Sequence, residues 1–314
     1  MNIVAFLIFL LFPLSIFAGE TCLIDVKSSI SSISSQGESK VFHTSDFLKK
    51  REYSKSILNI FGLNNHLQGL VYHPKTQVFY ISGGDFKNKE SMLLSLNNDN
   101  GRYEAFQRIK LDNELDLWHL GGINIFEDIL VAPLEKMGPG DKKSVVQLLD
   151  ISDPKNIRTL PNSFSRLGIS YGSADIIKKN NLYYLIAVNS SQLDIFTARS
   201  LTDEFTYLKS IKGKVFKASY IKVFQQCNGE TFIANFSPKR SIAGGKKNIL
   251  GLFNLDINAS SVNEIQKYTF HCDKKCGFRG AVGVYQRGQK LELISSKQNK
   301  EKDPEIHFKH FTSF

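Results

Sequence analysis

Residues 65–84 read NHLQGLVYHPKTQVFYISGG, in which two short runs of aliphatic and aromatic residues flank the polar turn Pro-Lys-Thr-Gln. Short apolar runs bounded by turn residues predict β-strands rather than a helix. The same order of a turn, a Gly-containing strand, a polar turn and a more apolar strand returns near Leu117, Ser170, Lys217 and Cys276. A repeated order of this kind predicts a repeat architecture.

These repeats have a nearly constant period. Successive separations are 53, 52, 48 and 59 residues when the equivalent positions are His66, His119, Tyr171, Ser219 and Phe278. Four short strands in each unit of about fifty residues are typical of a β-propeller blade. The sequence therefore predicts an all-β protein with a β-propeller fold, most simply of five blades.

The two ends of the chain bear on the blade count. The last unit supplies only three strands, so the N-terminal stretch around Val41–Leu48 is expected to provide the fourth and to close the ring by pairing with the last blade. Residues Phe47–Phe61 are the best candidate for a helix. If residues 47–62 formed strand instead, six blades would result.

Glycine recurs in the first strands of the repeats, at Gly69, Gly121, Gly122, Gly172 and Gly280. The first strands of a propeller crowd around the axis, where a side chain would collide with the neighbouring backbone. These glycines are therefore expected to build the centre of the ring rather than to bind a ligand.

The N-terminal region indicates export. Residues 1–18, MNIVAFLIFLLFPLSIFA, are apolar and uncharged and end on a small residue, which is the pattern of a signal peptide. An uncleaved anchor is the alternative. Residues 19–40 are Ser-rich and predict a mobile arm or an irregular lead-in, and residues 41–314 a single propeller domain. We expect a secreted or periplasmic monomer with no transmembrane helix after cleavage.

The four cysteines are Cys22, Cys227, Cys272 and Cys276. An even number in an exported chain predicts disulfides, and three pairings are open, one of which closes a small turn between Cys272 and Cys276. A zinc site is not favoured, because His271 beside these cysteines has no second ligand pair at a usual spacing.

The chain carries 40 Lys and Arg against 30 Asp and Glu, a formal net charge of +10. Positive charge on an exported protein attracts acidic proteins and anionic components of the cell envelope. The basic stretch Ser237–Lys247 is predicted to be a long loop that contacts a partner. Nucleic acid is not an expected partner, because no basic motif is interleaved with aromatic residues.

Several short motifs carry a family resemblance: H-x-Q-G at His66–Gly69, W-H-x-G-G-I at Trp118–Ile123, V-A-P-L-E at Val131–Glu135 and S-V-V-Q-L-L-D at Ser144–Asp150. Their order resembles the secreted bacterial β-propellers that include the dispase autolysis-inducing protein. The resemblance implies a propeller that acts on extracellular proteases without being an enzyme. It supplies no active-site pattern to carry over.

The first strands of a propeller begin at one mouth of the ring, so residues about fifty positions apart in the chain converge there. The candidate ligand-binding residues at this mouth are His66, Trp118, His119, Tyr171, Asp175 and Arg279. Such groups would bind an anion, a sugar or a peptide carboxylate, and would support acid–base catalysis if a carboxylate joined them. Alternatively, His66 and His119 hydrogen-bond neighbouring blades and hold the ring together.

No signature of a catalytic nucleophile, metal site or phosphate-binding loop occurs in the sequence, and no cofactor is expected. We expect an exported protein that binds an extracellular or envelope protein. The alternative is a glycosidase-like hydrolase, for which the candidate carboxylates are Asp85, Asp128, Glu135 and Asp175. An enzyme would place two carboxylates, or a carboxylate with the two histidines, within hydrogen-bond reach in an open mouth.

Overall fold

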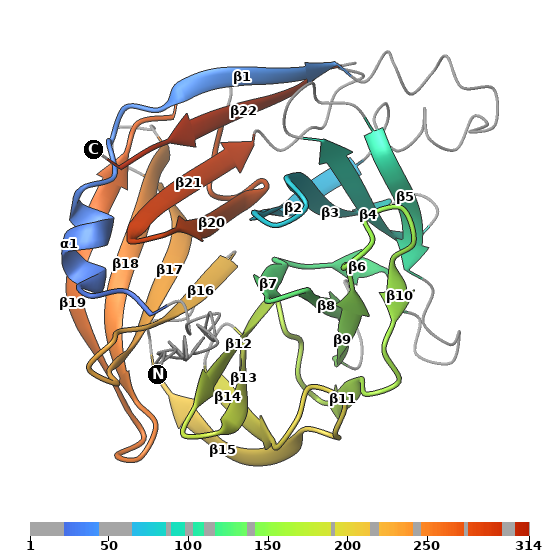
Figure 1. The fold of residues 1–314 in the computed structure, drawn as a ribbon, viewed down its shortest axis with the longest axis vertical. Helices are drawn as coiled ribbons and strands as arrows, with labels where there is room; N and C mark the ends of the chain where they lie inside the picture. The colour runs from blue at the N-terminus through green and yellow to red at the C-terminus, as the bar shows by residue number, and fades with distance from the viewer. Residues whose placement is uncertain are drawn as a thin grey trace, which may run out of the picture.

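The computed structural model describes residues 22–43, 65–85, 89–97, 103–109, 117–136, 142–189, 192–213, 220–240, 246–272, 276–296 and 305–313. These residues form one short helix and 22 strands, which confirms the all-β prediction. The strands gather in sheets that radiate from a common centre, a β-propeller-like arrangement (Figure 1). The helix predicted over Phe47–Phe61 lies outside the described residues.

Four consecutive groups of antiparallel strands follow one another around the centre. The first contains β2 (Asn65–His73), β3 (Val78–Asp85), β4 (Glu90–Asn97) and β5 (Tyr103–Ile109). The second contains β6 (His119–Leu120), β7 (Asn124–Phe126), β8 (Ile129–Glu135), β9 (Lys143–Asp150), β10 (Arg158–Thr159) and β11 (Phe164–Leu167). The third contains β12 (Ser173–Lys179), β13 (Leu182–Val188), β14 (Gln192–Ala198) and β15 (Thr206–Lys212). The fourth contains β16 (Tyr220–Gln225), β17 (Thr231–Arg240), β18 (Lys246–Asp256) and β19 (Ser261–Phe270).

The remaining strands come from both ends of the chain. They are β20 (Val282–Arg287), β21 (Lys290–Ser296), β22 (Glu305–Phe311) and β1 (Glu38–His43). β1 pairs antiparallel with β22 from Glu38 opposite His310 to His43 opposite Glu305. β20 pairs in parallel with β2 at a single position, Gly69 opposite Val282, so the hydrogen-bonded order runs continuously from β1 to β5.

The innermost strands run in one direction. Besides the parallel pairing of β2 with β20, a parallel bridge joins Gly122 to Ser173, and hydrogen bonds link β12 to β16 in the same sense. Each second strand runs antiparallel to its inner neighbour. We therefore define the axial mouth as the end of the ring where β2, β6, β12, β16 and β20 begin and where β3, β8, β13, β17 and β21 end.

The close approach predicted for the central glycines is confirmed at two of them. A Cβ added at Gly69 would lie 2.5 Å from the Ile123 nitrogen, and one at Gly121 would lie 2.3 Å from the Gly172 oxygen. Gly172 itself has open space around its own Cβ position. Backbone contacts this short leave no room for a side chain, so the inner strands pack directly against one another.

Apolar side chains fill the spaces between neighbouring sheets. Val71 and Tyr80 of the first group pack with Leu120 and Leu130 of the second in one buried cluster. The continuous apolar runs that predicted the strands therefore bury residues on both faces of each sheet, as stacked sheets require.

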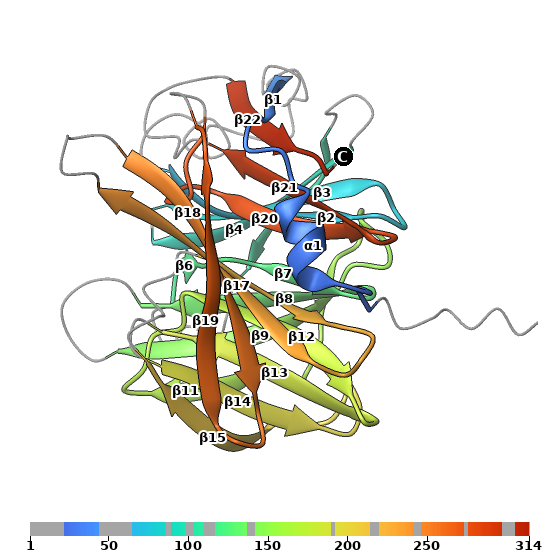
Figure 2. The ribbon, with the colours of Figure 1, turned by 90° about the vertical axis from the view of Figure 1, so that its left-hand side faces the viewer.

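Residues 22–40 do not form the mobile arm that their serine content predicts. They contain helix α1 (Val26–Ser31), and Leu23, Val26, Ile30 and Ile33 are buried in the cluster formed by the fourth and last groups of strands. These four residues are spaced by three and four positions, so one face of the segment is apolar despite its serines. We call residues 22–37 the N-terminal strap, which Figure 2 shows crossing the side of the molecule.

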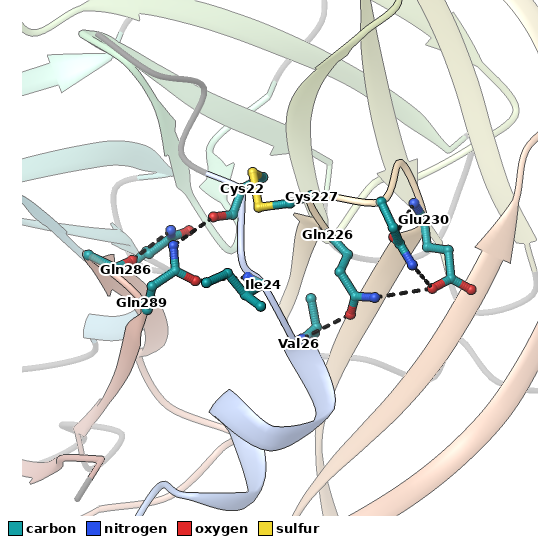
Figure 3. The surroundings of a disulfide bond; sticks show 10 residues. Cys22, Ile24, Val26, Gln226, Cys227, Glu230, Gln286 and Gln289 are labelled. Atoms are coloured by element: carbon teal, nitrogen blue, oxygen red, sulfur yellow. Dashed lines mark hydrogen bonds between the residues drawn. A yellow bond between two sulfur atoms is a disulfide. The ribbon is translucent and has the colours of Figure 1, made fainter. Parts of the chain in front are cut away.

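Two disulfides are present, Cys22–Cys227 and Cys272–Cys276, which is one of the three pairings left open by the sequence. The first joins the strap to the turn between β16 and β17 (Figure 3). Next to it, the Gln289 amide donates to the Cys22 carbonyl at 3.1 Å and accepts from the Ile24 backbone N–H at 2.8 Å. Covalent and polar contacts therefore hold the beginning of the described chain against the ring.

The basic stretch Ser237–Lys247 is not simply a loop. Its two arms belong to β17 and β18, which pair through Lys239 opposite Lys247 and Arg240 opposite Lys246. No helix in the described part of the chain is long and apolar enough to cross a membrane.

Candidate functional site

A histidine–carboxylate pair lies at the axial mouth. The β6–β8 pairing sets His119 opposite Glu135, with Nδ1 and Oε1 2.9 Å apart. The Gln68 amide nitrogen of β2 lies 2.9 Å from His119 Nε2, so it donates to this atom and the ring proton sits on Nδ1, toward the carboxylate. The Ser170 hydroxyl donates to Glu135 Oε2. One polar group thus joins three neighbouring sheets.

The environment of Glu135 favours its ionised form. The side chain is 15% exposed. Burial opposes ionisation, but the hydrogen bonds from His119 and Ser170 outweigh it and lower the pKa of Glu135 below its ordinary value. Trp118 packs edge-on against the His119 ring, with centroids 5.9 Å apart, and lies against Gly84 of β3. The mouth therefore holds a positioned anion beside a buried indole.

Below this pair, the centre of the ring is filled by Asn124 and Tyr220, both fully buried. The Asn124 amide donates to the carbonyls of Ala174 at 2.8 Å and Ile221 at 2.9 Å, and its oxygen accepts from the Tyr220 hydroxyl at 2.5 Å. The Val284 N–H donates to the same hydroxyl. These bonds connect β7, β12, β16 and β20, four of the innermost strands.

Asp175 is a buried member of the centre rather than an open carboxylate. Its side chain is inaccessible and lies 3.1 Å from the Lys222 amine, while the Val223 N–H donates to it at 2.7 Å. Burial raises the pKa of Asp175, and the Lys222 cation opposes that effect. The geometry ties β12 to β16.

Tyr171 is also fully buried, and its hydroxyl donates to Asp194. Arg166 and Gln192 each reach the same carboxylate at 2.6 Å. Burial and the neighbouring carboxylate raise the pKa of Tyr171. His119, Asp175 and Tyr171 therefore belong to three separate hydrogen-bonded groups.

The other two candidate residues occupy different settings. His66 lies in β2 opposite Gly84, as His119 lies opposite Glu135, but its side chain falls outside the described residues. Arg279 is exposed in the turn that precedes β20. Among the candidate residues whose side chains are described, His119 lies against a partly exposed carboxylate, that of Glu135.

Among the candidate carboxylates, Asp128 and Glu135 lie at opposite ends of β8. A strand of this length separates them by about 20 Å, and Asp128 instead lies 3.2 Å from the His73 ring and 2.6 Å from the Lys75 amine. Asp85 ends β3 as Glu135 ends β8, so these two residues belong to the same mouth. The backbone therefore places Asp85 and Glu135 at the same end of the inner strands and Asp128 at the other, while the Asp85 side chain lies outside the described residues.

A further histidine–carboxylate pair lies in the last group of strands. His310 Nε2 and the Glu292 carboxylate are 2.6 Å apart, the Tyr285 hydroxyl donates to the same carboxylate, and Arg287 lies 3.4 Å away. Burial alone would raise the pKa of Glu292, but the hydrogen bonds from His310 and Tyr285 lower it to about 2. This group joins β20, β21 and β22.

Sequence reasoning did not identify many of these polar residues, among them Gln68, Asn124, Ser170 and Lys222. Gln68 lies inside the H-x-Q-G motif and Ser170 directly precedes Tyr171, so their positions in the repeat were the available signal. Within the described residues no three His, Cys, Asp or Glu side chains are arranged to hold a metal ion.

No family model and no curated protein matches the chain. Among solved structures, the chain is similar to a fructofuranosidase from Schwanniomyces occidentalis complexed with fructose, at 10% identity and a TM-score of 0.48, covering 81% of this chain and 56% of that one. It is similar to the Bombyx mori GH32 β-fructofuranosidase BmSUC1, at 15% identity and a TM-score of 0.49, and the match covers 81% of this chain and 60% of that one. It is also similar to an exo-β-1,3-galactanase from Phanerochaete chrysosporium, at 11% identity and a TM-score of 0.42, and the match covers 72% of this chain and 60% of that one.

The chain spans less than two thirds of the length of these three proteins. Likeness at this level transfers no residue role and no substrate. The resemblance to secreted bacterial propellers stays a prediction.

Proposed function

We propose that this protein is an exported glycoside hydrolase whose active site is the axial mouth. The observation that carries the proposal is Glu135, a partly exposed carboxylate that His119 and Ser170 hold in place and in its ionised form. Glycosidases need one ionised carboxylate, either to attack the sugar or to activate water, and a second carboxyl group that protonates the leaving oxygen. Glu135 meets the requirements of the first role.

Asp85 is the proposed second carboxyl group. It ends β3, the strand of the neighbouring sheet that corresponds to β8, and it follows directly after Gly84, against which Trp118 packs. Its backbone position at the end of a second strand belongs to the same mouth as Glu135. In this arrangement His119 is a positioning residue, because Gln68 occupies its second nitrogen.

The proposed architecture is a five-bladed ring. It counts the continuous path from β1 to β5 as two blades, one of them β2–β5 and the other β20–β22 completed by β1. The antiparallel pairing of β1 with β22 supports closure between the two ends of the chain. We also propose export by residues 1–18, with which the two disulfides are consistent.

The test is turnover of aryl glycosides and oligosaccharides by the wild-type protein and by three variants. We expect Glu135→Gln and Asp85→Asn each to lower kcat by about 10²–10⁴-fold. Asp128→Asn is the matched control, because it removes a carboxylate at the other end of β8, and it should leave kcat unchanged. No turnover of any glycoside, or full activity of Glu135→Gln, would reject the proposal.

A second candidate function is binding of an extracellular or envelope protein without catalysis. One observation favours it: His119 and the buried carboxylates Asp175 and Asp194 are each engaged by neighbouring sheets, as structural ties would be. Capture of one defined protein from the extracellular fraction, unaffected by Glu135→Gln and without glycoside turnover, would support binding over hydrolysis.

A further inference from the structure

Exposed apolar side chains gather on two outer strands. Among the described residues five large apolar side chains are exposed, and three of them, Leu167, Tyr207 and Leu208, belong to β11 and β15. Their exposed fractions are 71%, 47% and 44%. β15 is the last strand of the third sheet, and Figure 1 shows it on the outer rim of the ring. A cluster of exposed apolar side chains marks a contact surface.

Tyr207 is held in a fixed position at this surface. The Arg166 guanidinium of β11 lies over the Tyr207 ring, 4.6 Å from its centroid, and the Tyr207 and Ser210 hydroxyls are 2.8 Å apart. Arg166 is itself fixed by the buried Asp194 carboxylate at 2.6 Å. A partner therefore meets an ordered aromatic ring, and little side-chain entropy is lost on binding. Because Asp194 neutralises Arg166, the centre of the surface does not select an anion.

Leu208 is exposed at a β-bulge. β14 and β15 pair through Ile195 opposite Lys209 and Phe196 opposite Tyr207, which leaves Leu208 without an opposite residue. A bulge at the edge of a sheet bends the strand and disfavours regular pairing with a further strand. A partner of this edge is therefore bound through side chains rather than through added backbone hydrogen bonds.

The charges on either side of Leu208 are self-complementary. Glu204 precedes Leu208 by four residues and Lys212 follows it by four, and both side chains are exposed. Within the described part of the chain, no ion pair joins either of them to another side chain. A two-fold rotation about an axis through Leu208 exchanges the two ends of this stretch, so Glu204 of one copy meets Lys212 of a second copy. We call Glu204, Tyr207, Leu208 and Lys212 the β15 strip.

The outermost strand of the next sheet lacks this arrangement. β19 also carries an exposed apolar residue at a bulge, Ile265, which has no opposite residue in β18. The charges beside it, Glu264 and Lys267, pair with each other at 2.7 Å. They are therefore satisfied within one chain, whereas those of the β15 strip are not.

We propose that two copies of this chain form a two-fold symmetric dimer through the β15 strip. Tyr207 and Leu208 of the two copies pack together, and each Glu204 pairs with Lys212 of the other copy. The opposite charges at the two ends of the strip favour a second copy over an unrelated protein, because only the two-fold rotation brings each charge to its opposite. This dimer differs from the monomer expected from the sequence, and it does not depend on hydrolase activity.

The dimer leaves both axial mouths open. β15 runs toward the mouth, because it is antiparallel to β14, which is antiparallel to β13. A two-fold axis perpendicular to β15 reverses the direction of this strand in the second copy. The two mouths therefore face opposite ends of the dimer.

The β15 strip is small for a protein interface. The extended chain from Glu204 to Lys212 spans about 26 Å. Interfaces that bury less than about 1,200 Å² are weak and transient. We therefore expect a reversible dimer with a Kd on the order of 10–100 µM.

Sedimentation equilibrium of the exported protein between about 5 and 500 µM measures this Kd. Leu208→Glu should weaken the dimer on the order of 100-fold, because it places two carboxylates at the apolar centre. Ile265→Glu is the matched control, since it makes the same change at the exposed bulge of β19. It should change the Kd by less than about twofold.

Charge reversal tests the two-fold arrangement itself. Glu204→Lys and Lys212→Glu each set like charges against one another and should weaken the dimer on the order of tenfold. The double variant Glu204→Lys/Lys212→Glu restores two opposite pairs, so its Kd should return to that of the wild-type protein. An equimolar mixture of the two single variants should form a heterodimer for the same reason.

Circular dichroism checks that the variants fold, and the charge variants keep the test valid if Leu208→Glu does not. A wild-type protein that stays monomeric at about 500 µM would overturn the inference. Equal effects of Leu208→Glu and Ile265→Glu, or a double charge variant that dimerises as weakly as the single variants, would also overturn it.

Discussion

Replacement of Asn124 by Ala tests whether the centre of the ring depends on one amide. The substitution removes two donated hydrogen bonds and one accepted hydrogen bond, all to buried groups of β12 and β16. A buried hydrogen bond contributes about 1 kcal/mol net, and a partner left unsatisfied costs about 1–3 kcal/mol. Three such bonds give an expected loss of about 3–6 kcal/mol in the free energy of unfolding.

This loss is a large part of the 5–15 kcal/mol typical of a folded domain. At about 2 °C per kcal/mol for a domain of this size, the Tm should fall by about 6–12 °C. Differential scanning calorimetry measures the shift, and Asn156→Ala, at an exposed turn position, is the control.

Tyr220→Phe completes a double-mutant cycle, because the Tyr220 hydroxyl donates to the Asn124 oxygen. The free energy of unfolding of the combined variant should fall by less than the sum of the decreases in the two single variants. A Tm for Asn124→Ala within about 2 °C of the wild-type value, or losses of Asn124→Ala and Tyr220→Phe that simply add, would refute the reasoning.

Three other expected outcomes concern stability. Cys22→Ser/Cys227→Ser should lower the free energy of unfolding by about 5 kcal/mol and Cys272→Ser/Cys276→Ser by about 2 kcal/mol, because the loop-closure entropy grows with the sequence separation, which is 205 residues for the first disulfide and 4 for the second. Urea unfolding measures both losses, and equal losses would contradict this ranking. Gly121→Ala should lower the Tm while Gly172→Ala does not, since only the first would place a Cβ 2.3 Å from a backbone oxygen; a Tm scan of both decides. The pKa of Glu292 is lowered to about 2, so the contribution of this carboxylate to stability is complete above about pH 4.5 and is lost as the pH falls toward 2. The Tm of Glu292→Gln should therefore vary less between pH 4.5 and pH 2 than the Tm of the wild-type protein, and the same pH dependence in both proteins would contradict this prediction.

Periodicity predicted the strands because each blade repeats the same burial requirement. The two apolar runs that flank the turn Pro-Lys-Thr-Gln became β2 and β3, and the repeats that begin near Ser170 and Lys217 became the third and fourth groups of strands. The N-terminal strap was misjudged because its serine content was weighed above the spacing of its four apolar residues. That spacing was visible in the sequence, so the signal existed.

The polar residues differ in how far the sequence could predict them. His119 and Glu135 could be suggested from the repeat and from the end of an apolar run, since both occupy recurring positions. Asn124 fits no repeat, because its amide alone links β7 to β12 and β16. Its role depends on which backbone carbonyls face the axis, which is a property of the assembled ring.

The filled centre constrains how any ligand reaches the mouth. Asn124 and Tyr220 are inaccessible and hydrogen-bond to each other between the inner strands, so a ligand of the proposed active site would meet a filled centre rather than an open channel. It must arrive and leave from the end where β8 and β17 finish. A long polymer would therefore lie across this end rather than thread the axis.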